Sequence, residues 1–133
     1  MTKNVKKKKS PSSIPFTFIF DYLYPKEPVI KPMFGCYALY LGKKLHFILR
    51  KRTTHKKING VWIATRKEHH ESLQKLFPSM RSIDVLGKSP TNWQILPEKS
   101  EDFESAVILA CELVKKGDVR IGVVPKKKRV DRS

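Results

Sequence analysis

Seven lysines and arginines lie between residues 43 and 57, and they are the residues of this sequence best suited to binding a charged ligand. The set, interspersed with His46 and His55, is Lys43, Lys44, Arg50, Lys51, Arg52, Lys56 and Lys57. No Asp or Glu occurs from Pro28 to Lys67. Cations held at fixed spacing on a sheet can pair with the phosphates of a polyanion. The spacing therefore predicts a basic β-ribbon that contacts phosphate.

The same cations also have an interpretation that needs no ligand. Lysines on an exposed strand protect a sheet edge from aggregation, and surface charge serves solubility. In the functional interpretation, a two-stranded ribbon lies in or across a DNA groove and its cations meet phosphates. Five or six such contacts would give a slope of about −5 for log affinity against log salt. The sequence leaves both interpretations open.

Histidine, cysteine and acidic residues form no recognisable catalytic or metal-binding motif. His69 and His70 are adjacent between Glu68 and Glu71, but neighbouring side chains on a helix point about 100° apart. The sequence contains no HExxH motif, no paired CxxC spacing and no nucleophile elbow. We therefore expect no catalytic residues, no metal and no cofactor. Enzymatic activity stays open only through a catalytic triad whose residues are distant in sequence and meet in the fold.

The tryptophans and cysteines favour packing roles. Trp62 and Trp93 fall in segments with strand character. Stacking on unpaired bases is conceivable for an exposed indole, but packing is the commoner role of a strand tryptophan, and we expect it for both. Cys36 and Cys111 lie within apolar runs, which favours buried reduced thiols over a disulfide.

The composition predicts one folded domain with basic ends. The chain has 133 residues, of which 40% are hydrophobic, and a formal charge of +16. We expect a disordered basic leader at 1–13, a single domain at 14–124 and a basic tail at 125–133. The run from Pro125 to Val130 also has the composition of a short nuclear-import signal, a pattern that basic runs often match by chance.

Charge and hydropathy together predict the partners. No apolar run reaches the roughly twenty residues of a membrane span. The apolar segment 16–23 is interrupted by Asp21 and lacks the cleavage site of a signal peptide. We therefore expect a cytoplasmic protein with no membrane association. Its expected partner is nucleic acid, DNA rather than RNA, and a protein partner stays open.

Alternating apolar residues predict the strands that carry the cations. Strands are predicted at residues 36–41, 45–51, 61–65, 82–86 and 92–96. The first three form an antiparallel meander, in which Leu45, Phe47 and Leu49 are expected to share one buried face. The pair Asn59-Gly60 indicates a tight hairpin turn before the third strand. A turn at 87–90 separates the last two strands.

Helical periodicity places three helices around this meander, at residues 15–24, 66–77 and 100–116. Thr65 and Glu68 have the spacing of a capping box, Ser100 is the expected cap of the last helix, and Gly117 is its expected left-handed end. Residues 120–124 are either a last strand or an extended arm. We expect an α+β domain with an antiparallel sheet of about five strands packed on the N- and C-terminal helices, the helix at 66–77 connecting the two halves.

The segment from Lys31 to Phe47 resembles the start of the TfoX N-terminal-domain and YjbR (MmcQ-like) families. Its Met33-Phe34-Gly35-Cys36 run follows the pattern of their MFGG-type turn between a helix and a strand. Support continues in the strand-to-helix step at 61–77, in Asn92-Trp93 and in the closing helix, so that the resemblance spans about residues 14–124. Departures are Cys36 in place of the second glycine and Lys43-Lys44 in place of an acidic turn residue.

The resemblance implies a compact α+β fold, likened to a double-wing DNA-binding domain, with no established catalysis. It also implies structural roles for its matching residues: a tight turn for Gly35, and packing for Met33, Phe34, Asn92 and Trp93. We therefore expect a non-enzymatic nucleic-acid-binding or regulatory module without sequence specificity. The alternatives are a protein-interaction module with incidental charge and a small-ligand or catalytic pocket.

Overall fold

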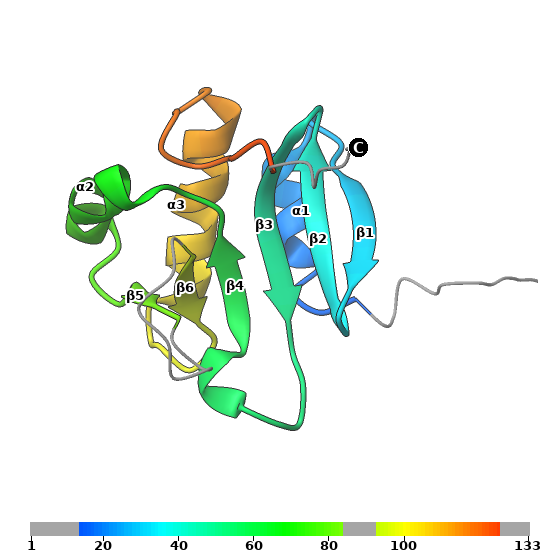
Figure 1. Cartoon of the computed structure of the whole chain (residues 1–133), viewed down its shortest axis with the longest axis vertical. Helices are drawn as coiled ribbons and strands as arrows, with labels where there is room; N and C mark the ends of the chain where they lie inside the picture. Colours follow the sequence, from blue (N-terminus) through cyan, green and yellow to red (C-terminus); the bar gives the residue numbers. More distant parts are fainter. Residues whose placement is uncertain (1–13, 84–92, 126–133) are drawn as a thin grey trace, which may run out of the picture.

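A computed structural model of the protein describes residues 14–83 and 93–125. The predictions for the leader 1–13, for the turn at 87–90, for Asn92 and for the tail beyond residue 125 fall outside these residues. Within the described ranges, a six-stranded sheet and three α-helices confirm the α+β class, with one strand more than expected (Figure 1).

Every strand of the sheet runs antiparallel to its neighbours, in the order β1-β2-β3-β4-β6-β5. The bounds are β1 Val29–Met33, β2 Cys36–Leu41, β3 Lys44–Arg50, β4 Gly60–Ile63, β5 Arg81–Ser82 and β6 Gln94–Pro97. The predicted meander is confirmed, because β2, β3 and β4 are consecutive neighbours. Strand β6 overlaps the strand predicted at 92–96, whereas β5 shares only Ser82 with the strand predicted at 82–86, of which residues 84–86 lie outside the described ranges.

Strand β1 is the one that sequence patterning did not identify. Four of its five residues are exposed, so no alternation of buried and exposed side chains marks it. It contains Pro32, which lacks an N–H group and is tolerated in a sheet mainly at an edge, where β1 lies. Phe34 and Gly35 join β1 to β2. Their φ angles of 53° and 79° are those of a type I′ hairpin.

Strand β3 is buried on both faces, contrary to the expectation of a half-buried strand. Phe47 and Leu49 face the helices, whereas Leu45 belongs to the apolar cluster on the other face. The register explains the difference. Leu39 pairs with Phe47, but its neighbour Tyr40 pairs with Leu45, which leaves one extra residue in β3. Such a bulge shifts side chains to the opposite face, so the prediction that Leu45 shares a face with Phe47 and Leu49 is wrong.

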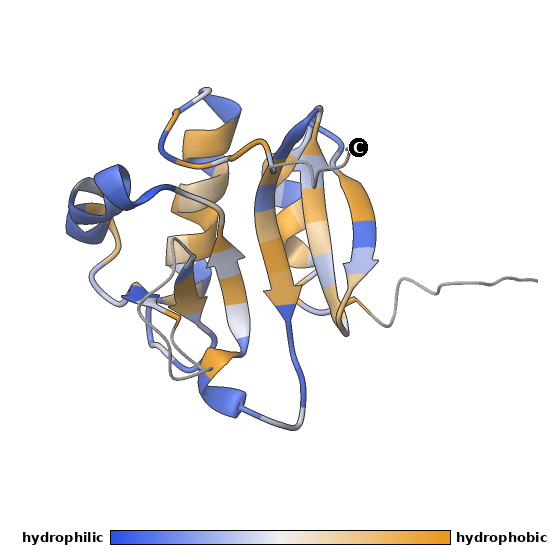
Figure 2. Ribbon diagram, in the orientation of Figure 1, coloured by the Kyte–Doolittle hydropathy of each residue, from blue (hydrophilic) through white to orange (hydrophobic). Residues whose placement is uncertain are grey.

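The main core lies between the sheet and the helices α1 (Phe18–Leu23) and α3 (Phe103–Lys115). These helices pack against each other on one side of the sheet, while the short helix α2 (His70–Leu76) lies beside the β4 end (Figure 1). Figure 2 shows apolar residues concentrated in the central strands and in α3, whereas α2 is hydrophilic. None of the described helices is both long and apolar enough to cross a membrane.

Two of the predicted helix caps do not form. Thr65 is buried, and a 3-10 turn, η4 (Lys67–His69), precedes α2 without a side-chain cap hydrogen bond. The capping box of Thr65 and Glu68 is therefore wrong. Helix α3 begins at Phe103, again without a side-chain cap hydrogen bond, so Ser100 does not cap it.

The end of α3 and the segment after it are well defined by backbone hydrogen bonds. The N–H groups of Gly117 and Asp118 donate to carbonyls of the last helical turn at 3.0 and 2.9 Å, a Schellman motif that confirms Gly117 as the helix end. The chain then returns to the sheet. Val123 and Leu45 exchange two backbone hydrogen bonds, so this segment is an extended arm anchored to β3 by a single bridge.

Candidate nucleic-acid interface

The seven predicted phosphate-binding cations fall into two groups at opposite ends of β3. Lys43 and Lys44 lie at the turn between β2 and β3, and the other five lie at or beyond the end of β3. A strand of this length spans about 20 Å. Figure 1 shows the turn between β2 and β3 at the upper end of the sheet and residues 51–59, the β3–β4 loop, at the lower end. The cations therefore do not form one continuous ribbon.

Arg50 is not a surface cation. The residue is 5% exposed, and its guanidinium donates hydrogen bonds to the carbonyl of His55 at 3.0 Å, to Oδ1 of Asn59 at 2.6 Å and to the carbonyl of Thr54 at 2.9 Å. A buried guanidinium with its donors occupied in this way organises the loop. The structure thus corrects the role predicted for Arg50, which is withdrawn from the set of phosphate contacts.

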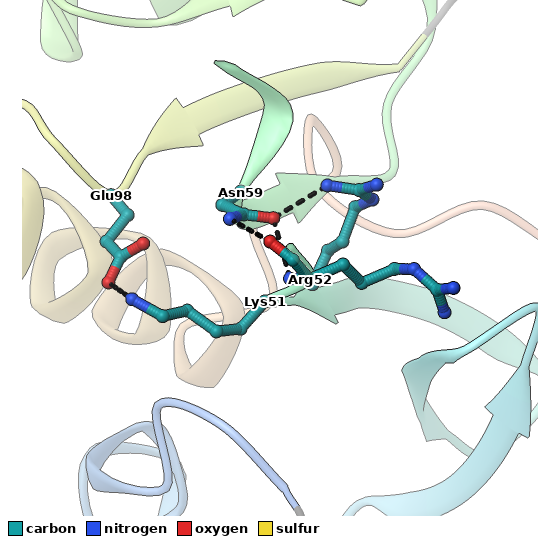
Figure 3. A network of polar contacts seen from close by, with 5 residues as sticks. Lys51, Arg52, Asn59 and Glu98 are labelled. Carbon is teal, nitrogen blue, oxygen red and sulfur yellow. Dashed lines mark hydrogen bonds and ion pairs between the residues drawn. The ribbon is translucent and has the colours of Figure 1, made fainter. Parts of the chain in front are cut away.

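Asn59 ties the β3–β4 loop together from its other end. Its Oδ1 also accepts a hydrogen bond from the N–H of Arg52 at 2.9 Å, and its Nδ2 donates to the carbonyl of Arg52 at 2.8 Å (Figure 3). Its backbone is extended, with φ −71° and ψ 136°. The tight turn predicted at Asn59-Gly60 is therefore wrong, and the connection is the longer loop that this side chain closes.

Lys51 and Arg52 point in opposite directions from the start of the loop (Figure 3). The ammonium of Lys51 forms an ion pair with Glu98, which follows β6. The guanidinium of Arg52 lies against the backbone of Gly35, because a methyl group added at Gly35 would fall 1.4 Å from its Nη1. Arg52 thus brings the β3–β4 loop into contact with the tip of the β1–β2 hairpin.

Further cations complete this end of the molecule. Lys56 and Lys57 are exposed in the 3-10 turn η3 (Lys56–Ile58). Exposed Arg81, from β5, donates a hydrogen bond to the carbonyl of Lys57. Sequence reasoning missed Arg81, because only the sheet topology brings β5 toward the loop. We call the five cations the basic end: Lys51, Arg52, Lys56, Lys57 and Arg81. Within the described residues, Lys51 alone among them has an ion-pair partner.

Phe34 lies at the hairpin tip, one residue before Gly35, against which Arg52 packs. It is 92% exposed, so the packing role that the family resemblance implied for it is wrong. Gly35 takes the turn conformation expected of it. Met33 is partly buried against the apolar cluster on the helix-free face, as expected. The Sγ of Cys36 lies 3.8 Å from the carbonyl oxygen of Phe34 and contributes a weak hydrogen bond across the turn.

The two tryptophans pack on the helix-free face of the sheet, as expected. Their rings meet edge to face with centroids 6.0 Å apart, and both lie against buried apolar residues. The indole N–H of Trp62 donates to the carbonyl of Ile58 at 2.9 Å. Both rings therefore contribute to the packing of this face of the sheet.

Both thiols are free and buried, which confirms the expectation of reduced cysteines. Burial raises the pKa of Cys111 to about 12. Burial also raises the pKa of Cys36, against the opposing charges of Arg50 and Arg52. Neither thiol is set up as a nucleophile, because a reactive cysteine needs a lowered pKa and access to solvent.

A half-open cavity of about 220 Å³ lies near the anchored arm rather than at the basic end. Leu45, Ala64, Val123 and Trp93 contribute to its lining, with Arg66 as the charged residue. These residues include no acid–base pair. Across the described ranges, no group of three or more His, Cys, Asp and Glu residues is placed to hold a metal ion.

Comparison of the chain with protein-family models, with curated proteins and with solved structures finds no match. The resemblance to the TfoX N-terminal-domain and YjbR families therefore stays a prediction, and the functional argument depends on the geometry of the basic end.

Proposed function

We propose that the protein is a non-enzymatic module that binds nucleic acid without sequence specificity, and that the basic end is its contact surface. One observation carries the proposal: five cations from two separate parts of the chain meet at one end of the sheet, and Glu98 is the only acid that pairs with them among the described residues. Phosphate contacts by Lys and Arg supply most of the affinity of sequence-independent binding.

The buried pair of Arg50 and Asn59 supports the proposal, because it holds the loop that carries the cations. Side chains on an ordered loop lose less conformational freedom on binding than those on a disordered segment. We also propose that the protein belongs to the TfoX N-terminal-domain or YjbR family, on the basis of the sequence resemblance. It agrees with this function, since that fold is likened to a DNA-binding domain.

The competing function, a protein-interaction module, has one observation in its favour: Val29, which pairs with Tyr40, and its neighbour Ile30 are 55% and 37% exposed. That alternative predicts an exposed apolar patch near Tyr37, Tyr40 or Trp62. All three residues are partly buried and pack against the apolar clusters of the sheet. Lys31 also covers the ring of Tyr40, with its ammonium 4.9 Å from the ring centre.

The proposal is tested by a pair of double substitutions that change the net charge equally. Lys56→Gln with Lys57→Gln alters the basic end, and Lys43→Gln with Lys44→Gln alters the opposite end of β3. Affinity for a 20-base-pair duplex is measured by fluorescence anisotropy between 25 and 200 mM salt on the full chain.

We expect the basic-end variant to lower the salt slope by about 2 and the affinity at least tenfold at low salt. The control pair should cause a clearly smaller loss. Equal losses would show that only net charge matters, and undiminished affinity in both variants would assign binding to the terminal runs; either result contradicts the proposal.

A further inference from the structure

We propose that Phe34 stacks on an unpaired base, so that the basic end takes single-stranded nucleic acid in preference to a duplex. The inference rests on the proposed function, because the cations of the basic end would hold the backbone of the strand. It adds the class of nucleic acid and a residue that contacts a base.

The backbone at Phe34 is the first observation. Its φ of 53° lies in the left-handed region, which a bulky side chain adopts at an energetic cost and which Asn, Asp or Gly fills readily in a type I′ turn. The ring is 92% exposed and gains no packing in return. Folding alone therefore favours a small or polar residue here, and the phenyl ring needs another explanation.

The rigidity of the hairpin tip is the second observation. Met33 and Cys36 pair directly across the turn, the Cys36 thiol reaches the Phe34 carbonyl, and Arg52 lies against Gly35 from the neighbouring loop. The ring is thus presented from an ordered turn. A ring held in this way loses little conformational freedom when it binds a flat partner.

The position of Arg52 is the third observation, because a cation at the turn favours a partner that carries a negative charge. Its guanidinium lies against the backbone of Gly35, one residue after Phe34. A cation at the same turn as an exposed ring suits a ligand that carries a negative charge near a flat apolar surface, as a nucleotide does. In a duplex both faces of each base are covered by stacked neighbours, so an unpaired base fits the ring better. A phenyl ring offers no hydrogen bonds to base edges, which predicts tolerance of all four bases.

The test uses the full chain and two fluorescein-labelled probes, a 12-nucleotide oligo(dT) and a 12-base-pair duplex. Phe34→Asn suits the turn and removes the ring, so that any loss of binding does not arise from a weaker fold. Phe34→Tyr retains the ring. Val119→Ala removes an exposed apolar side chain elsewhere, as a matched control, since Val119 is 69% exposed in the turn after α3.

We expect Phe34→Asn to weaken oligo(dT) binding about 5- to 150-fold, the change that corresponds to one base–aromatic stack. Duplex affinity should stay within about twofold, Phe34→Tyr should stay near the parent, and Val119→Ala should be unchanged. Unaltered oligo(dT) binding by Phe34→Asn overturns the proposal. Equal losses on both probes also overturn it, since they indicate an apolar wedge into duplex DNA.

The outcome is separable from that of the proposed function. The variant with Lys56→Gln and Lys57→Gln should weaken binding to both probes. If that variant binds both probes as tightly as the parent, the proposed function fails, and with it the claim that the basic end holds the backbone of the strand. A loss of oligo(dT) affinity by Phe34→Asn in that case would show only that the ring stacks on a base. The reverse result leaves the basic end in place and removes Phe34 from the interface.

Discussion

The Oδ1 atom of Asn59 lies 2.6 Å from Nη1 of Arg50, and both residues are buried. The same amide binds the N–H and the carbonyl of Arg52. One side chain therefore joins the end of β3, the start of the β3–β4 loop and the residue that precedes β4. The exposed cations of that loop owe their positions to this buried contact.

Asn59→Ala should lower the free energy of unfolding by about 2–3 kcal/mol, because it removes three hydrogen bonds and leaves the Arg50 guanidinium short of a partner. Urea denaturation measures the change. Asn59→Asp keeps the acceptor oxygen and removes only the donor to the carbonyl of Arg52, so its free energy of unfolding should fall by less. A loss below about 0.5 kcal/mol for Asn59→Ala would show that water replaces the amide at little cost.

Gly60→Ala should destabilise the sheet far more than Gly42→Ala. Both glycines have positive φ, at 147° and 62°. A Cβ at Gly60 would lie 2.3 Å from the carbonyl oxygen of Leu96, which cannot move without disturbing the pairing of β4 with β6. At Gly42 nothing lies within 4 Å. In urea denaturation, we expect the free energy of unfolding to fall by at least about 3 kcal/mol for Gly60→Ala and by about 1 kcal/mol for Gly42→Ala. Similar decreases for the two variants would contradict the close approach at Gly60.

The sequence predicted elements whose signals are local. The positions of strands β2 and β3, the apolar stripe of α3 and the glycine that ends α3 each depend on neighbours a few residues away, and each is found in the structure. Features set by distant contacts were missed. The bulge that moves Leu45 to the other face of β3 arises from pairing with β2, and edge strand β1 has too few buried side chains to show a period.

The candidate site was only partly predictable for the same reason. Charge alone marked Lys51, Arg52, Lys56 and Lys57, but it marked buried Arg50 equally. Only the folded loop distinguishes a guanidinium that binds backbone carbonyls from one that faces solvent. The packing role expected of Phe34 came from the family resemblance, and an aromatic side chain in a turn carries no local signal that it is exposed.

Glu98→Gln should strengthen duplex binding, if the proposed function holds. The substitution removes the acid that pairs with Lys51, which leaves one more cation for phosphate. We expect the salt slope to steepen by about 1 and the affinity at low salt to rise severalfold. Glu112→Gln, on the exposed face of α3, changes the net charge equally and is the control. An equal gain from both would indicate a purely global effect of charge.

The pair of Asp118 and Arg120 should make stability depend on pH at the acid end of the range. Hydrogen bonds from Arg120, at 2.9 and 2.7 Å to the two carboxylate oxygens, lower the pKa of Asp118 to about 2. The unfolded value is about 3.9. A lowered folded pKa stabilises the protein above the unfolded pKa, and this contribution disappears as the pH falls from about 4 toward 2.

Asp118→Asn should therefore lower the free energy of unfolding by about 1 kcal/mol at pH 6 and by progressively less below pH 4. Urea denaturation at pH 6, 4 and 2.5 measures the difference between variant and parent. A difference that stays constant across this range would show that the carboxylate charge does not contribute, and that the side chain acts only through its shape and hydrogen bonds.

Strand β1, with Pro32 next to Lys31, also bears on how molecules of this protein behave when crowded together. A row of unpaired N–H and C=O groups at a sheet edge recruits strands from other molecules. Pro32 removes one donor from the middle of that row, and Lys31 places a charge beside the gap. Pro32 and Lys31 thus discourage edge-to-edge aggregation, which matters most where many copies of the protein lie close together, as they would on one polyanion if the proposed function holds.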